Sequence, residues 1–157
     1  MNAPATLDHA GIARRIPHHG AMCLLERLLS WDDGTIVCQA GDHTDPAHPL
    51  RLDGVLPAAS ALELASPALA LHGALCSPAA AGPTPGFLAS ARGVRMRVRR
   101  LDDAPGPLCV RAQRVAGGDA QAVYAFDLRD AHDRVLVDGR ATVMFGAALT
   151  VPAGRAS

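Results

Sequence analysis

The chain has 157 residues, 49% of them hydrophobic, and its 15 Lys and Arg residues balance its 15 Asp and Glu residues. This length and hydrophobic content predict a single domain over residues 1–157, with a core from about 8 to 147. The balanced charge argues against a nucleic-acid partner, because binding to a phosphate backbone usually requires a strongly basic surface.

The cysteines lie singly and form no CxxC pair; they are Cys23, Cys38, Cys76 and Cys109. The N-terminal residues 1–15 lack the basic-then-apolar order of a secretory signal, so we expect the reducing cytoplasm. His18 and His19 are adjacent but have no matching second pair of ligands, and we expect no metal site.

The first third of the chain predicts a short helix and a hairpin. Residues 8–15 fit a short helix that Pro17 would end. Residues 22–29 fit either a short helix or a strand, because periodicity alone does not separate the two. Asp33-Gly34 is a tight-turn dipeptide followed by β-branched residues, which indicates a hairpin from about 25 to 40.

A polar loop at 42–54 precedes a helix that begins at Pro57 and runs for about 18 residues. Apolar residues occupy nearly every side of this helix, which predicts a core helix that is buried all round. Polar residues and a proline interrupt it too often for a membrane span: Glu63, Ser66, Pro67 and His72. A buried carboxylate needs a partner or a shifted pKa, so Glu63 is the first candidate functional residue.

The rest of the chain is typical of a sheet. A Pro/Gly/Ala linker at 77–86 is followed by four strand-like segments, at 87–100, 107–115, 122–130 and 134–145. A hairpin, one buried helix and these strands predict an α+β fold whose curved antiparallel sheet wraps around the helix, the hotdog arrangement. The edges of such a sheet need protection, so we expect a dimer.

Four stretches, two of which overlap, resemble the 3-hydroxyacyl-[acyl carrier protein] dehydratases, over roughly residues 16–145. IPHHGAMCLLERLLSWDDGTIV resembles their "LPHRxPxLLxDRVL" opening, and LPAASALELA resembles their "MPGVLxxEAL" helix start. HPLRLDGVLPA and HGAL resemble the divergent branch of the family that is associated with aryl polyene pigment biosynthesis.

The resemblance implies a catalytic His in the loop before the helix and a catalytic acid in the helix. Glu63 falls on the family's acid. Counting back from the helix start, the family's His falls on Pro49, so His48 takes the role if this loop is one residue longer, and His43 is the fallback. Pro67 stands where the family has Gln, which removes a backbone N–H from the helix.

These residues would support dehydration of a 3-hydroxyacyl thioester on an acyl carrier protein without any metal or cofactor. A neutral His48 would abstract the proton beside the carbonyl. Glu63 with a raised pKa would either act as the acid that protonates the departing hydroxyl or position the hydroxyl and water. Backbone N–H groups near Ala58 and Ala59 would face the thioester oxygen. His18 would brace the loop or contact substrate, and an acyl chain would lie in a tunnel beside the helix.

Plainer interpretations of the same residues stay open. His48 fits a solvated loop histidine, and Glu63 fits a buried carboxylate held by hydrogen bonds. His72 fits a residue that complements the helix dipole or lies at an interface. The basic residues Arg95, Arg97, Arg99 and Arg100 fit either a docking surface for the acidic carrier protein or a solvated strand face.

Three functional hypotheses follow. The first is a hydro-lyase for carrier-bound 3-hydroxyacyl chains in fatty-acid or polyene biosynthesis, acting as a homodimer or as a heterodimer with a related subunit. The second is a hotdog thioesterase, in which a carboxylate activates water. The third is a non-catalytic acyl-binding subunit of a dehydratase heterodimer, which the displaced His and Pro67 favour.

Overall fold

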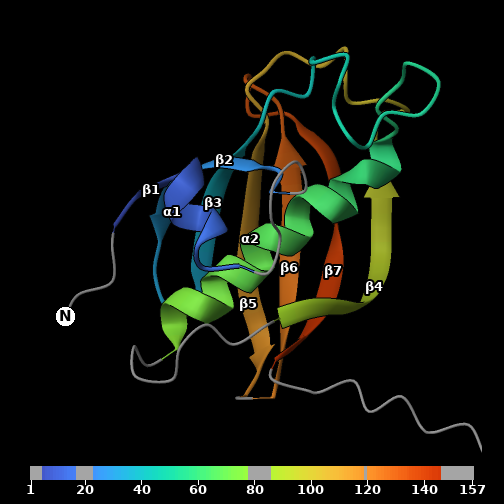
Figure 1. The fold of residues 1–157 in the computed structure, drawn as a ribbon. Coiled ribbons are helices and arrows are strands. Elements are labelled where there is room, and N and C mark those ends of the chain that lie inside the picture. Colours follow the sequence, from blue (N-terminus) through green and yellow to red (C-terminus); the bar gives the residue numbers. More distant parts are fainter. Residues whose placement is uncertain (1–4, 17–22, 78–85, 119, 146–157) are drawn as a thin grey trace, which may run out of the picture.

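One curved, seven-stranded antiparallel sheet of order β1-β2-β3-β5-β6-β7-β4 wraps around the long helix α2 (Figure 1). The structure is a computed structural model that describes residues 5–16, 23–77, 86–118 and 120–145. The strands are β1 (Leu7–Asp8), β2 (Leu25–Trp31), β3 (Thr35–Ala40), β4 (Gly86–Met96), β5 (Cys109–Gly117), β6 (Gln121–Arg129) and β7 (Val135–Phe145). The helices are α1 (His9–Ala13), the 3₁₀ turn η2 (Ala58–Ser60) and α2 (Ala61–Cys76).

The predicted hairpin is β2 and β3, and the ambiguous residues 22–29 contribute a strand from Leu25 onward. Asp32 closes its turn, because its Oδ1 accepts hydrogen bonds from the backbone N–H groups of Gly34 and Thr35, each at 2.8 Å. These bonds lower the pKa of the Asp32 carboxyl, since they stabilise its charged form.

The four strands predicted after the helix are present as β4, β5, β6 and β7. Burial alternates along β6, where Ala122, Tyr124, Phe126 and Leu128 face α2 and the core. In the described part of the chain, β4 pairs only with β7, so the other side of this 11-residue strand is a free sheet edge (Figure 1). A free edge of this length offers unpaired backbone groups to a partner strand.

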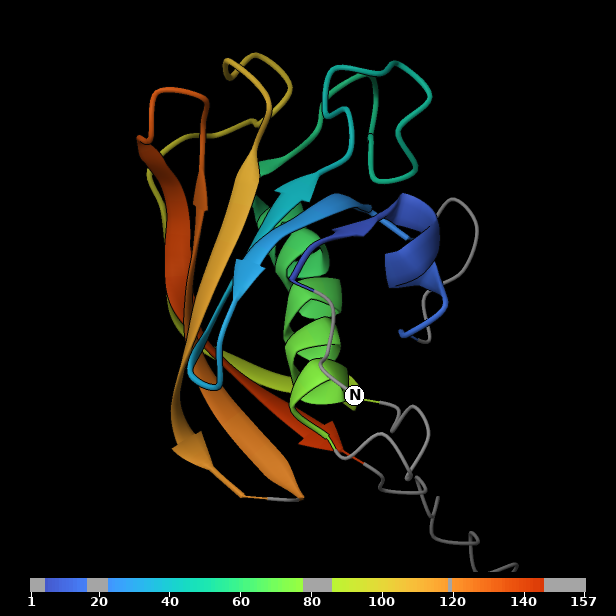
Figure 2. The ribbon, with the colours of Figure 1, turned by 90° about the vertical axis from the view of Figure 1, so that its left-hand side faces the viewer.

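Helix α2 crosses the concave face of the sheet (Figure 2). Ala58–Cys76 is long and apolar enough to span a membrane by length and composition, but 61% of that window is buried, as in the core helix of a soluble protein. The helix continues through Pro67. The prediction that it is buried all round is wrong at Glu63, which is exposed in the single chain; the other residues of the helix are buried or partly buried.

Candidate active site

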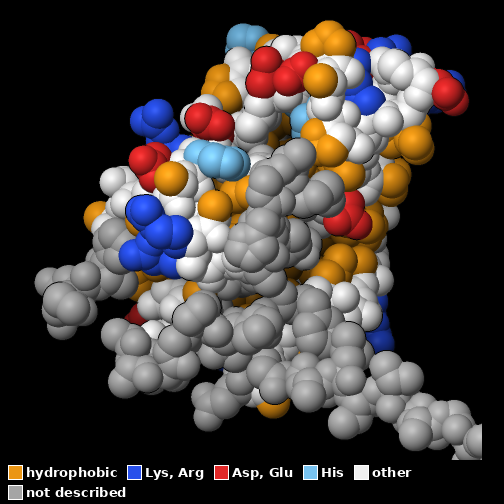
Figure 3. All heavy atoms as spheres, viewed as in Figure 1, with side chains coloured by type: hydrophobic (Ala, Val, Ile, Leu, Met, Phe, Trp, Pro, Cys, Tyr) orange, Lys and Arg blue, Asp and Glu red, His pale blue; other side chains and the backbone are white. Residues whose placement is uncertain are grey.

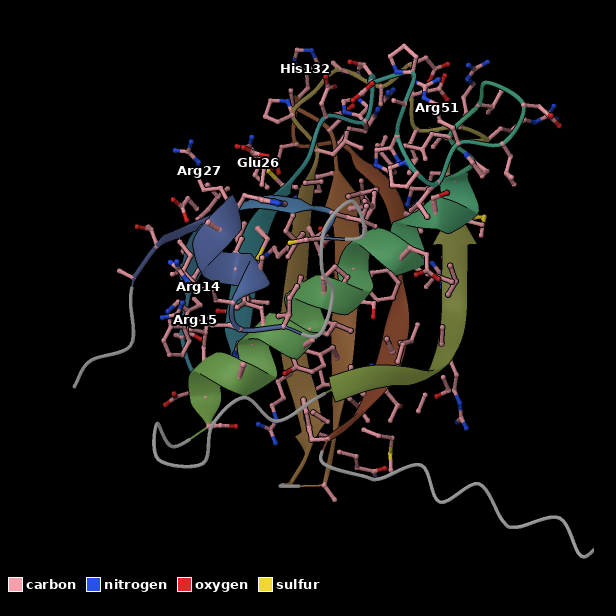
Figure 4. The ribbon with its side chains drawn as sticks, viewed as in Figure 1. Arg14, Arg15, Glu26, Arg27, Arg51 and His132 are labelled. Atoms are coloured by element: carbon pink, nitrogen blue, oxygen red, sulfur yellow. The ribbon has the colours of Figure 1, made fainter. Side chains whose placement is uncertain are left out.

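The loop that leads into α2 is organised by Arg51, a residue that the sequence analysis did not single out. Its guanidinium donates to four backbone carbonyl oxygens, those of Asp45 (2.8 Å), Gly54 (2.7 Å), Thr44 (2.9 Å) and His43 (3.3 Å). Figure 4 shows Arg51 among the loops above the start of the helix. Since one planar guanidinium group binds carbonyl oxygens at both ends of residues 43–54, it fixes the loop that carries His48.

The start of the helix is tied to the chain that follows β4. The backbone N–H of Ala58 donates to the carbonyl of Arg99 at 3.0 Å, and that of Leu56 donates to the Asp102 carboxylate, also at 3.0 Å. Arg100 forms charged hydrogen bonds with Asp102, which hold the pKa of that carboxyl far below its ordinary value. The candidate site therefore lies beside the end of the free edge strand.

His48 is half-buried, and its Nδ1 accepts the backbone N–H of Leu50 at 3.2 Å. Burial lowers the pKa of His48, and the like charge of Arg51 lowers it further, so the ring is neutral near pH 7. Because Nδ1 is the acceptor, the neutral ring carries its proton on Nε2. In this arrangement His48 presents a hydrogen-bond donor, whereas a general base needs a free lone pair.

His43 is buried beneath the loop that follows β4. Its Nε2 lies 2.7 Å from the carbonyl oxygen of Ala104, so this nitrogen carries the proton and donates it. The ring packs so closely against Gly106 that a Cβ there would overlap it. These contacts make His43 a structural brace and do not support its fallback role as the base.

Glu63 and the helix-start N–H groups differ from expectation. Glu63 is exposed in the first turn of α2, so the prediction of a buried carboxylate is wrong for the single chain. Among the described residues, no hydrogen bond or ion pair joins it to His48. The N–H of Ala58 is bonded to Arg99, which leaves Ala59, exposed in the same turn, as the candidate donor to a thioester.

His18 lies outside the described residues, as does most of the linker at 77–86. Within the described ranges, no group of three or more His, Cys, Asp or Glu residues is arranged to hold a metal ion. Figure 3 shows acidic and basic side chains interspersed over the upper loops on this face, with no continuous patch of one sign.

His72 belongs to a buried network that joins α2 to the sheet. The ring is fully buried; its Nε2–H donates to the carbonyl of Asp32 at 2.8 Å, and its Nδ1 accepts the hydroxyl of Tyr124 at 2.7 Å. Trp31 and Tyr124 contact the ring edge to face. The proposed interface role of His72 is therefore wrong for this chain, and the HGAL motif that contains it serves the core.

Comparison with known protein families finds one that matches most of the chain. Residues 10–150 match the ApeP-like family, described as ApeP dehydratase. The chain belongs to this family. No curated protein sequence matches it significantly.

Solved structures share the fold. The dehydratase heterocomplex ApeI:P from Xenorhabdus doucetiae aligns with a TM-score of 0.74 and 21% identity, covering 85% of this chain and 90% of that chain. Thioesterase HI1161 from Haemophilus influenzae aligns with a TM-score of 0.60 and 17% identity, covering 92% and 95%. AziG from S. sahachiroi aligns at 0.57 and 15%, covering 75% and 88%.

These matches confirm the predicted α+β hotdog fold and the resemblance to the dehydratases near the aryl polyene branch. At such identities the structural likeness concerns the fold alone, and thioesterases share it. The family match is what identifies this chain as a hotdog of the dehydratase type.

Proposed function

We propose that the chain is one subunit of a cytoplasmic dehydratase that removes water from 3-hydroxyacyl thioesters carried on an acyl carrier protein, in fatty-acid or polyene chain building. The match of residues 10–150 to a dehydratase family carries this proposal. The geometry supports it, because a braced loop presents His48 just before the helix that carries Glu63. The acyl chain would lie beside α2, with Ala59 donating to the thioester oxygen.

One chain supplies only part of the active site, and a partner subunit supplies the rest. Glu63 is the one formal charge on α2 and is exposed, and the helix start adjoins the end of β4, whose outer edge is unpaired in the described part of the chain. A related hotdog subunit that added its own edge strand to β4 would extend the sheet and cover this face. The ApeI:P complex is a heterocomplex, which favours a heterodimer over a homodimer here.

The role of His48 in this proposal depends on which of its ring nitrogens faces the substrate. With Nδ1 bonded to Leu50, the Nε2–H would donate to the carbonyl or to the departing hydroxyl. Proton abstraction by His48 requires the ring to turn so that an unprotonated nitrogen faces the substrate.

The observed orientation of His48 favours a second candidate function, a non-catalytic subunit that binds the acyl chain while its partner supplies the base. The helix residue Pro67 is compatible with it, because the family's Gln is missing there. A thioesterase remains the alternative chemistry of the same fold, and its product is a free acid.

Turnover of a carrier-bound 3-hydroxyacyl substrate, followed by mass spectrometry, tests these roles with the chain alone and mixed with a related hotdog subunit. Loss of one water supports a dehydratase, and release of free acid would identify a thioesterase. We expect Glu63→Gln to slow dehydration by about 10²–10⁴-fold. Asp33→Asn, which removes an exposed carboxylate in the turn between β2 and β3, is the matched control and should keep the wild-type rate.

His48→Ala separates the two candidate functions. If His48 takes part in the chemistry, the variant loses turnover to a similar extent. Wild-type rates for His48→Ala and Glu63→Gln in an active mixture would show that this chain supplies no catalytic side chain, which is the result expected for the second candidate.

A further inference from the structure

A groove of about 770 Å³ crosses the outer face of the sheet, over β5, β6, β7 and β4. This face is turned away from α2 and from the candidate active site, toward the left-hand side of Figure 2. Five arginines and two aspartates contribute to its lining. The proposed dehydration uses none of them.

The two aspartates of the groove are already neutralised. Asp127 binds Arg129 at 2.8 Å, and Asp138 binds Arg97, which lies outside the groove, at 2.7 Å. Four exposed guanidinium groups of the groove have no ion pair with any described residue: those of Arg92, Arg95, Arg111 and Arg140.

The strand register sets two of these cations side by side. Arg92 of β4 is directly opposite Arg140 of β7, and the same row continues through Ala125 of β6 to Gln113 of β5. Like charges directly opposite one another on a sheet repel. Since no carboxylate lies in this row, an anion bound between the two guanidinium groups would relieve the repulsion.

The adjacent row on the same face places one cation at each end. Arg111 of β5 and Arg95 of β4 flank the two aspartates in register. Residues that share a face along one strand are about 7 Å apart. The groove is open between the rows, because Ala125 is small and Gly93 has free space where a side chain would be.

We propose that this groove binds a small polyanion that carries two or more phosphate groups. Guanidinium groups bind phosphate oxygens in a bidentate manner, and two neighbouring rows of them suit consecutive phosphates of a di- or triphosphate. The lining combines five arginines with few apolar side chains, those of Ala125, Phe126 and Val135, so the phosphates rather than an apolar moiety would supply the recognition.

Isothermal titration calorimetry with inorganic triphosphate at low salt tests the proposal. The double variant Arg92→Gln/Arg140→Gln should bind at least about tenfold more weakly than wild type. The control Arg14→Gln/Arg27→Gln makes the same charge change at exposed sites on the opposite side of the molecule, and it should bind as wild type does (Figure 4). Added salt should weaken binding to the wild type.

The variants should remain folded, because removing Arg92 and Arg140 relieves a like-charge contact; their melting temperatures without ligand should equal or exceed that of wild type. Triphosphate should raise the melting temperature of wild type and of the control, and not that of the double variant. Titrations with ATP and coenzyme A then distinguish free from nucleotide-borne phosphates, either of which supports the proposal. Absence of saturable binding by wild type, equal weakening in the control, or binding of an acidic protein but not of triphosphate would overturn it.

Discussion

Replacing Tyr124 by Phe tests whether the buried network around His72 holds the helix to the sheet. The change removes one hydroxyl and leaves the Nδ1 of His72 without the donor that lies 2.7 Å away in a fully buried site. A buried polar atom that loses its partner costs about 1–3 kcal/mol of unfolding free energy. For a chain of 157 residues, about 2–4 °C per kcal/mol then gives a melting temperature lower by about 2–12 °C.

Urea unfolding and thermal melting, both followed by circular dichroism at one protein concentration, measure this loss. Thr142→Val is the matched control, because it also removes a hydroxyl, from a half-exposed side chain on the outer face of β7. The control should change the unfolding free energy by less than about 0.5 kcal/mol. If Tyr124→Phe is as stable as wild type, or if the control loses as much unfolding free energy, the hydrogen bond between Tyr124 and His72 does not stabilise the fold.

Three further perturbations address the loops and the pH dependence. Arg51→Gln should lower the unfolding free energy by about 1–3 kcal/mol and speed proteolysis within 43–54, since four carbonyl oxygens lose their donor; an unchanged cleavage pattern would contradict this. Gly106→Ala should cost about 1–3 kcal/mol because its Cβ overlaps the His43 ring, whereas Gly118→Ala, with open space around it, should be neutral in the same denaturation assay. Burial lowers the pKa of His72 below its ordinary 6.5, so the unfolded state binds more protons as the pH falls; the contribution of His72 to the unfolding free energy should be fully present above pH 6.5 and be lost on acidification below it, and a rise of the unfolding free energy would refute this.

The fold could be predicted because its signals are local and repeated. The Asp33-Gly34 turn, the apolar helix after Pro57 and the alternation in the last strands each indicate one element, and together they permit few arrangements. The order β1-β2-β3-β5-β6-β7-β4 was beyond reach, because no local pattern states which strands are neighbours.

The candidate site was predicted less well, because it depends on where side chains point. A sequence places His48 and Glu63 near the helix start, but only coordinates show that the imidazole accepts a backbone N–H and that the carboxylate is exposed. The role of Arg51 was hidden for a similar reason: its partners are backbone carbonyls, which every residue has. Its position in the HPLRLDGVLPA motif was the available signal.

The proposal that a partner subunit completes the site rests on two features of the architecture. Glu63 is the one exposed residue of α2 in the single chain, although Pro67 and Ala70, one and two turns further along the same side of the helix, are buried. The helix start is tied through Arg99 to the end of β4, so a subunit that pairs with this edge necessarily approaches the same residues. Oligomerisation and assembly of the site are then one event: charged substitutions along the edge of β4 that prevent pairing should abolish turnover even with His48 and Glu63 intact.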